Sequence, residues 1–147
     1  MVNAVPMSQS RTIQTKLILP PDTNHHHSIF GGKVLAYIDE IAAIASMKHA
    51  KSEVVTASID SVDFVSPAYA GEVLELDVRV TCKNLITSEE RLTTESFITM
   101  VAIDENGKTS EVPPVYPETE FERRLFETGP QRREHRKAKR AFRHENN

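Results

Sequence analysis

The segment from Asn24 to Ser46 concentrates the residues whose types and spacing could do chemistry. It holds three consecutive histidines, a Gly31-Gly32 pair that opens an apolar stretch, and the acidic pair Asp39-Glu40 inside that stretch. Imidazoles and carboxylates this close in sequence suit either metal binding or acid–base catalysis. The two possibilities make different demands on geometry.

A metal site requires ligands that converge. Zinc takes three or four of them around one point. Consecutive residues in a loop point in different directions, so His25, His26 and His27 do not readily share one ion. No Cys or His elsewhere in the sequence has a spacing that would complete such a site. We therefore predict no metal, and a polar loop whose imidazoles make local hydrogen bonds.

Asp39 is the stronger candidate for chemistry. It falls in a helix predicted over 31–50 that is apolar on nearly every side, which is typical of a buried helix. Burying a carboxylate costs on the order of several kcal/mol of folding free energy, unless the group is paired or takes part in catalysis. Asp39 is therefore a general base or nucleophile, or else a carboxylate paired with a lysine or a backbone group, and the residues alone leave both open. Its neighbours at helical spacing are Leu35, Ala36, Ala42 and Ala43.

Gly31 and Gly32 begin this helix. Unpaired N–H groups at a helix start can hold an anion or a developing oxyanion, and glycine lets a ligand approach the backbone closely. Asn24 lies just upstream and could orient a water molecule or a carbonyl oxygen. Glycine is common at helix starts, so this pair does not by itself identify a site.

The surrounding elements predict an α+β fold. Strands are expected over 12–19, 53–65, 73–82 and 91–103, with a bulge where the alternation breaks at 58–61. The strand over 91–103 is apolar on both faces from Phe97 onward, which favours a central position. A last helical segment begins near Glu118. One strand, a long helix and then only strands indicate an antiparallel sheet wrapped around one central helix.

Composition limits the classes of function. With 147 residues, 39% of them hydrophobic and 27% charged, the chain suits one soluble domain. Cys82 is the one cysteine, so no disulfide forms within the chain, and we expect a small core residue there. The first residues lack the features of a signal peptide, and no apolar run reaches the roughly 18 residues of a membrane span. We expect a cytoplasmic protein that does not enter membranes.

Charge is unevenly distributed. Residues 129–147 hold seven Lys and Arg against two Glu, a balance of +5 in a chain whose net charge is −3. A basic tail on an acidic body indicates a polyanionic ligand or a solvated terminal helix. Nucleic acid is not the expected partner, because aromatic residues make up 6%, Trp is absent and no nucleic-acid-binding motif occurs.

Taken together, these residues resemble the hotdog-fold acyl-CoA thioesterases, specifically the cytosolic acyl-CoA hydrolase branch. The resemblance covers about 11–140. The matching residues are Pro20-x-x-x-Asn24, Ile29-Phe30-Gly31-Gly32, Asp39-Glu40-x-Ala42, Val55-Thr56-Ala57-Ser58-Ile59-Asp60, Val62-Asp63-Phe64, Pro67, Gly71-Glu72, Phe97-x-Thr99-x-Val101-Ala102 and Asp104-Glu105-Asn106-Gly107-Lys108.

The resemblance implies an architecture and a reaction. It implies an N-terminal extension over 1–10, a hotdog domain over 11–116 with a five-stranded sheet, and a basic helical tail over 117–147. The domain pairs into a homodimer, and trimers of dimers are usual. The reaction is hydrolysis of a fatty acyl-CoA to free CoA and a carboxylate, with no cofactor beyond the CoA of the substrate. The alternative on the same fold is a module that binds acyl-CoA without hydrolysing it.

The resemblance also implies roles for particular residues. Asn24 and Asp39 come together across the dimer interface, with Asp39 as general base or nucleophile. The residues implied to bind the oxyanion and the substrate are Gly31, Gly32, Thr56 and Phe64. The CoA phosphates meet the basic tail, for which a solvated helix end is the equal alternative; the tail residues are Arg132, Arg133, Arg136 and Lys137, with Arg140 beside them.

Two departures from the family pattern have consequences. The family usually has glycine where His27 stands. Relatives also follow the third strand with a Gly-Arg-Thr-Ser-like turn and a further strand, whereas Lys83 here leads directly into 84–91, which matches the turn after the family's fourth strand. We therefore predict either a sheet that is one strand short, by about five or six residues and a turn, or a chain from which a segment is missing.

Overall fold

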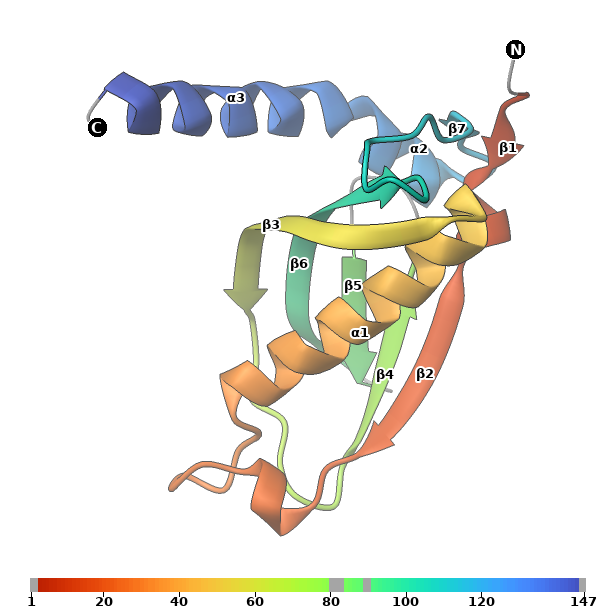
Figure 1. The fold of residues 1–147 in the computed structure, drawn as a ribbon. Coiled ribbons are helices and arrows are strands. Elements are labelled where there is room, and N and C mark those ends of the chain that lie inside the picture. The colour runs from red at the N-terminus through yellow and green to blue at the C-terminus, as the bar shows by residue number, and fades with distance from the viewer. Residues whose placement is uncertain (1–2, 80–83, 89–90, 146–147) are drawn as a thin grey trace.

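The fold is one long helix crossing a single antiparallel sheet. The computed structural model describes residues 3–79, 84–88 and 91–145. Helix α1 (Gly31–Ala50) lies across the sheet (Figure 1). The strands are β2 (Thr12–Leu17), β3 (Glu53–Phe64), β4 (Val73–Val78), β5 (Asn84–Ser88) and β6 (Arg91–Ile103), in the order β2-β4-β5-β6-β3. The predicted α+β hotdog architecture is confirmed.

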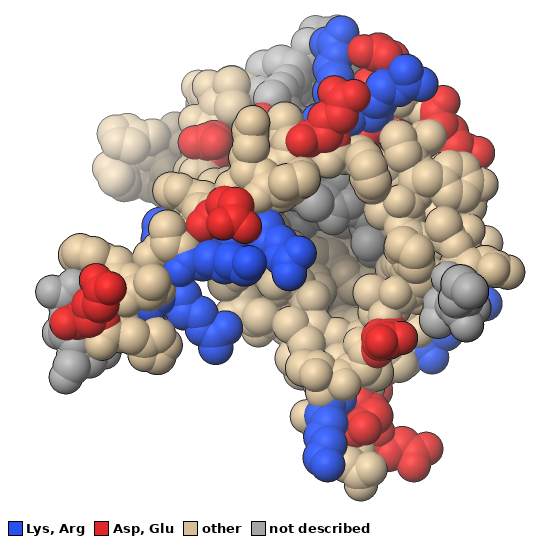
Figure 2. Space-filling view, turned by 90° about the horizontal axis from the view of Figure 1, so that it is seen from above, with Lys and Arg blue, Asp and Glu red and all other residues tan. Residues whose placement is uncertain are grey.

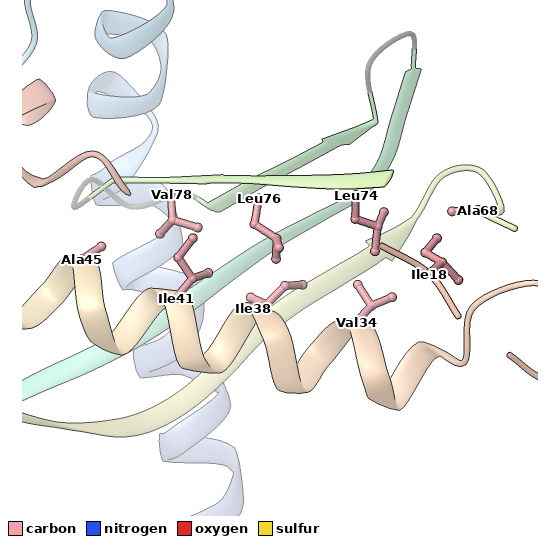
Figure 3. Close-up of a cluster of buried hydrophobic side chains, with 9 residues drawn as sticks. All are labelled: Ile18, Val34, Ile38, Ile41, Ala45, Ala68, Leu74, Leu76 and Val78. Carbon is pink, nitrogen blue, oxygen red and sulfur yellow. The ribbon is translucent and has the colours of Figure 1, made fainter. Parts of the chain in front are cut away.

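Helix α1 supplies one side of the core. Val34, Ile38, Ile41 and Ala45 recur at intervals of three and four residues, so they form one buried stripe. The stripe packs against the inward-facing side chains of β4, and the alanine allows close approach (Figure 3). The β4 residues in this cluster are Leu74, Leu76 and Val78. Helix α1 ends where Lys51 adopts a left-handed φ of 54°.

The opposite side of α1 corrects one expectation. The sequence predicts a helix buried nearly all round, but Ala36, Glu40 and Met47 are exposed in the single chain. The sheet has one concave face and covers only one stripe of the helix. The apolar residues on the other stripe therefore lie at the surface of the monomer.

Strands β3 and β6 form the longest pair in the sheet. Strand β6 lies in the interior of the sheet between β5 and β3, which agrees with its apolar faces, and β3 is an edge strand. Their register shifts between Thr56 and Ser58 and again between Ile59 and Ser61, which confirms the predicted irregularity. A bulge changes which face of the sheet the following side chains occupy.

The region after β4 differs from the prediction. Strand β4 ends at Val78, Arg79 follows outside the strand, and residues 80–82, with Cys82, lie outside the described residues. The residues expected to form a turn, Asn84–Ser88, instead form β5. This strand pairs with β4 on one side and with β6 on the other, where Asn84 lies opposite Ser96. The sheet therefore has five strands and is not one strand short. Backbone groups on β4 and β6 require a partner, which favours even a five-residue strand between them.

The N-terminal segment pairs with the segment that follows β6, beside the main sheet. Strand β1 (Val5–Pro6) pairs in parallel with β7 (Val115–Tyr116), and the short helix η1 (Met7–Ser10) follows β1. A second short helix, η2 (Pro20–Asp22), precedes the histidine loop. Helix α2 (Glu120–Glu127) leads into α3 (Gly129–Glu145), which projects beyond the sheet (Figure 1). Across the described residues, no helix is both long and apolar enough to cross a bilayer.

Candidate active site

Asp39 and Thr56 form the centre of the candidate site. Asp39 lies on α1 and Thr56 on β3, just before the first register shift. The Thr56 hydroxyl donates a hydrogen bond of 2.7 Å to Asp39 Oδ1. Asp39 is half-buried in the single chain, so the expectation of a fully buried carboxylate is not met at the level of the monomer. Its neighbour Glu40 is exposed.

Asn24 organises the histidine loop. Its Oδ1 accepts a hydrogen bond of 2.9 Å from the His26 backbone N–H, and its Nδ2 donates to Ser28 Oγ at 3.1 Å. Its backbone N–H donates to the Ser28 carbonyl at 2.8 Å, so the loop closes on itself. Within the described part of a single chain, no hydrogen bond joins Asn24 to Asp39. The structure brings Thr56, not Asn24, to the carboxylate.

The histidines lie at the tip of this loop. All three are exposed, and the rings of His25 and His26 lie 3.9 Å apart between centroids. His27 adopts a φ of 63°, in the left-handed region that glycine enters most easily. This explains in physical terms why a glycine is usual at this position. No cluster of three or more His, Cys, Asp or Glu side chains suited to a metal occurs among residues 3–79, 84–88 and 91–145.

The start of α1 borders a cavity of about 370 Å³. Gly31 and Phe64 both line it, together with Ser28 from the histidine loop and Val34 from α1. A Cβ on Gly31 would lie 3.1 Å from Phe64 Cζ, so glycine allows the ring to pack against the helix start. In the described chain, neither Gly31 nor Gly32 donates its N–H to a hydrogen bond within the protein. Both donors are suitably placed at a helix start to meet an oxyanion.

The predicted phosphate-binding residues divide into two groups. Arg133, Arg136 and Lys137 line a groove between α3 and the sheet. Arg132 points elsewhere: its guanidinium donates to the Leu125 carbonyl at 2.8 Å and lies 4.4 Å from the Phe97 ring centroid. Arg132 therefore joins α3 to α2 and to β6, and is not in the groove.

Asp60 is a residue for which the sequence predicts no role. Its carboxylate accepts hydrogen bonds of 2.6 Å from both Ser58 Oγ and Thr99 Oγ1, and Arg136 lies 3.4 Å away. The sequence feature closest to Asp60 is the broken alternation around Ser58. This feature predicted a bulge but did not indicate which face of the sheet each side chain would occupy.

Comparison with known proteins identifies the family. Residues 26–82 match the model of the thioesterase superfamily. The chain is 43% identical over 143 residues to an acyl-CoA thioester hydrolase from Bacillus subtilis, which covers 88% of this chain and 83% of the relative. The chain belongs to the hotdog acyl-CoA thioester hydrolases. A human cytosolic acyl coenzyme A thioester hydrolase is 32% identical over 94% of this chain, which spans 40% of that longer protein.

Solved structures of this thioester hydrolase family superpose closely. A structure described as an apo-hexameric acyl-CoA thioesterase is 55% identical, with a TM-score of 0.88 over 95% of this chain and 99% of the other. An acyl-CoA hydrolase from Staphylococcus aureus, in complex with butyryl coenzyme A, coenzyme A and coenzyme A disulfide, is 42% identical, with a TM-score of 0.92 over 98% and 94%. Three variants of the staphylococcal enzyme replace an asparagine, an aspartate and a threonine by alanine, at positions 15 and then 17 residues apart.

This thioester hydrolase is also shorter than its relative within the aligned region. The alignment with the Bacillus protein extends over 143 residues but takes in 88% of this chain, or about 129 of 147 residues, which leaves about 14 positions without a counterpart here. The match to the family model ends at residue 82, next to the predicted gap after Lys83.

Proposed function

We propose that this chain hydrolyses the thioester of a fatty acyl-CoA, with Asp39 as the general base or nucleophile and Asn24 supplied by a second chain. The observation that carries the proposal is the 2.7 Å hydrogen bond from Thr56 to Asp39, in a chain of the acyl-CoA thioester hydrolase family. A carboxylate held by a neighbouring hydroxyl has one oxygen fixed, which leaves the other oriented for proton transfer.

The spacing of residues supports these roles. Asn24, Asp39 and Thr56 are 15 and 17 residues apart. They match in type, order and spacing the three residues replaced by alanine in the staphylococcal enzyme. We assign Thr56 to positioning the carboxylate, which refines the substrate-binding role expected from sequence.

The proposed chemistry needs only a base, donors and water. Asp39 removes a proton from water as its oxygen attacks the thioester carbon, and the carbonyl oxygen takes up the displaced electron pair. The N–H groups of Gly31 and Gly32 stabilise that oxyanion. The carbon–sulfur bond then breaks, and the CoA thiolate takes a proton, leaving a free carboxylic acid. Direct attack by Asp39 on the carbon, followed by hydrolysis of the resulting anhydride, is the alternative order. Neither order requires a metal or a further cofactor.

The acyl chain is proposed to enter the cavity at the start of α1. Phe64 and Val34 line this cavity and contribute apolar surface, while Gly31 borders it with its backbone. Its volume of about 370 Å³ lies at the lower end of the range usual for small-ligand sites. A second chain that covers the exposed stripe of α1 would enlarge and close it.

A dimer is proposed to complete the site. Strand β3 is a 12-residue edge strand whose Val55 and Ile59 are 46% and 44% exposed, and an unpaired apolar edge favours pairing with another strand. Pairing along β3 would bring the Asn24 loop of one chain towards Asp39 of the other. Trimers of such dimers follow the hexameric state of the 55% identical neighbour. We expect a cytoplasmic location, as for the human relative.

The test is release of free CoA thiol from short-, medium- and long-chain acyl-CoAs. Asp39→Asn should lower kcat by at least about a hundredfold, because the proton acceptor is lost. Glu40→Gln is the matched control, since it removes the adjacent but exposed carboxylate and should leave kcat within about twofold. Equal turnover by the parent and Asp39→Asn would exclude the mechanism. Binding of acyl-CoA by the parent without turnover would favour the non-catalytic alternative.

A further inference from the structure

We propose that Met100 is an oxidation site, and that its conversion to the sulfoxide weakens the hydrogen bond from Thr56 to Asp39 and slows hydrolysis. Met100 lies on β6 directly opposite Thr56 of β3. Its Sδ lies 3.5 Å from Thr56 Oγ1, the hydroxyl that donates to Asp39 Oδ1 at 2.7 Å. One hydroxyl therefore has two acceptors within reach. This inference rests on the proposed function, because Asp39 carries the effect on the rate.

The reduced thioether leaves the hydroxyl proton to Asp39. A hydroxyl has one proton to donate, and a thioether sulfur is only a weak acceptor. The carboxylate is charged and closer to the hydroxyl, so it takes the proton. Reduced Met100 thus fills space beside the Thr56–Asp39 pair and competes little for its proton.

Oxidation places a stronger acceptor at this point. The Met100 sulfur attacks one oxygen of hydrogen peroxide, the oxygen–oxygen bond breaks as the sulfur–oxygen bond forms, and the second oxygen leaves as water with both peroxide protons. The sulfur is oxidised and the peroxide is reduced. The product is a polar side chain in place of an apolar one, and its oxygen lies beside the Thr56 hydroxyl. Two oxygens then compete for one proton, which weakens the bond that fixes Asp39.

Met100 is accessible enough to react. Susceptibility of methionine to oxidants follows exposure. Met7 is fully buried, whereas Met100 is half-buried beside the exposed Thr56, so a molecule as small as hydrogen peroxide reaches its sulfur from the side of Thr56. Met47 is 43% exposed and lies on α1, eight residues after Asp39. Met47 is therefore a control that is easily oxidised but about two helical turns from the carboxylate.

Met100 lies on the face of the sheet opposite to the basic helix. Ile98 packs against the core around α1, and side chains alternate along a strand, so Met100 faces α1 whereas Thr99 faces outward. Thr99 lines the groove between α3 and the outer face of the sheet, here called the α3 groove. Figure 2 shows Lys and Arg side chains gathered along the projecting helix beside a hollow. A change at Met100 therefore acts on the Asp39 side and leaves the charges of α3 in place.

The experiment treats the protein with hydrogen peroxide, removes the peroxide with catalase, and measures thiol release from one acyl-CoA. Peptide mass spectrometry records the oxidation of each methionine. We expect kcat to fall by about tenfold as Met100 is converted, the effect of losing a hydrogen bond to a charged group. Methionine sulfoxide reductase should restore the rate, whereas dithiothreitol alone, which reverses disulfide formation at Cys82, should not.

Matched variants separate Met100 from the other oxidation sites, each compared with its own untreated rate. Met100→Leu should keep kcat within about twofold after peroxide, whereas Met47→Leu should lose activity as the parent does. Thr56→Val lacks the hydroxyl, so oxidation of its Met100 should lower kcat by less than about twofold, because both changes remove the same bond. A merely structural effect of the sulfoxide would instead lower kcat in Thr56→Val as much as in the parent.

Three outcomes would overturn the inference. They are full activity of the parent with Met100 converted, a tenfold further loss in oxidised Thr56→Val, and no conversion of Met100 under conditions that oxidise Met47. Turnover by the untreated parent tests the proposed function separately. In crystals of the oxidised protein the sulfoxide oxygen should lie within hydrogen-bond distance of Thr56 Oγ1, whether or not the enzyme turns over. A sulfoxide oxygen that points away from Thr56 would also contradict the inference, and thermal melting confirms that each preparation is folded.

Discussion

The hydrogen bond between Thr56 and Asp39 links β3 to α1 through two residues that are 17 positions apart in the chain. Its short distance and charged acceptor make it one of the stronger hydrogen bonds in the site. A helix and an edge strand each supply one partner, so the carboxylate is fixed by the packing of α1 on β3. This arrangement suits a reaction that depends on the direction of one oxygen atom.

Replacing Thr56 tests this positioning role. Thr56→Val keeps the shape of the side chain but removes the donor, so we expect kcat to fall by about tenfold or more, the effect of losing a hydrogen bond to a charged group. Thr56→Ser retains the hydroxyl and should recover most of the activity. Steady-state kinetics with one acyl-CoA measure both. A Thr56→Ser variant as impaired as Thr56→Val would indicate that packing, and not the hydrogen bond, matters there.

At the scale of elements, α2 is attached to the sheet by a charged network. Arg79 at the end of β4 donates to Glu122 Oε1 at 2.9 Å, and Glu122 Oε2 accepts from the Glu118 N–H at 2.9 Å. Arg79 also lies 3.3 Å from Asp77, which Arg11 contacts at 2.7 Å. The Glu122 side chain is 1% exposed, so its charge depends on these partners. The network ties together β2, β4 and α2.

This network makes the free energy of unfolding depend on pH in the acidic range. Burial alone would raise the pKa of Glu122, but hydrogen bonds from the Glu118 backbone and from Arg79 outweigh burial and hold the pKa below its usual 4.5. Burial likewise opposes ionisation of Asp77, and Arg11 and Arg79 lower its pKa below 3.8. Groups with lowered pKa values stabilise the fold above the unfolded pKa and lose that contribution as the pH falls.

We therefore expect the free energy of unfolding to decline as the pH falls below about 4.5, the ordinary pKa of Glu122. Glu122→Gln should lower stability at pH 7 by about 2–4 kcal/mol, because Arg79 loses a buried partner. The same variant should also show a flatter decline in acid. Urea denaturation at several pH values measures both effects. Parallel curves for the parent and Glu122→Gln would contradict this account of the acid dependence.

Arg132 and Arg133 are adjacent on α3 but have different expected roles. Arg132 contacts the Leu125 carbonyl and the Phe97 ring, so Arg132→Ala should lower the free energy of unfolding by about 1–2 kcal/mol. Arg133 is exposed in the α3 groove, so Arg133→Ala should leave stability within about 0.5 kcal/mol. Thermal and chemical unfolding distinguish them. Equal destabilisation by the two substitutions would mean that α3 as a whole, and not the Arg132 contacts, stabilises the fold.

At the scale of the whole molecule, the exposed stripe of α1 and the open edge of β3 indicate that the monomer is incomplete. Ala36 and Met47 on α1 and Val55 and Ile59 on β3 are exposed in one chain. Asn24 makes no hydrogen bond to Asp39 in the described part of that chain. A dimer that joins these surfaces would bury the apolar residues and bring the two polar residues together.

Mixing inactive subunits tests whether the site is shared. In a dimer that combines Asn24→Ala with Asp39→Asn, one site carries both substitutions and the other carries neither. The unfractionated random mixture should therefore recover about a quarter of the parent activity, and the isolated mixed dimer about half, given a symmetric two-chain site. Co-expression with two affinity tags isolates the mixed species, and thiol release measures its activity. No recovery in folded, mixed dimers would mean that Asn24 and Asp39 act within one chain.

The sequence by itself determined the elements that depend on local pattern. The bounds of α1 and β6 follow from local pattern, because apolar residues recur at helical spacing in one, and the apolar run of the other stops at the turn over 104–107. The irregular region after Thr56 was likewise visible in the residues, whereas the left-handed conformation of His27 came from the structure. Asn24 and Asp39 were candidates from residue type and position, Thr56 was a candidate through the family resemblance, and the catalytic roles of all three stay predictions.

Only the tertiary structure decided what depends on partners distant in the chain. Strand β5 forms because β4 and β6 each have backbone N–H and C=O groups that need a partner. The turn-like sequence of its five residues does not by itself predict a strand. Arg132 and Arg133 are alike in sequence, yet the packing of α3 on β6 sends one to an aromatic ring and the other to a groove. The exposure of Asp39 likewise depends on how far one sheet can wrap around one helix. Local pattern fixes where helices and strands form, whereas long-range packing fixes which side chains meet.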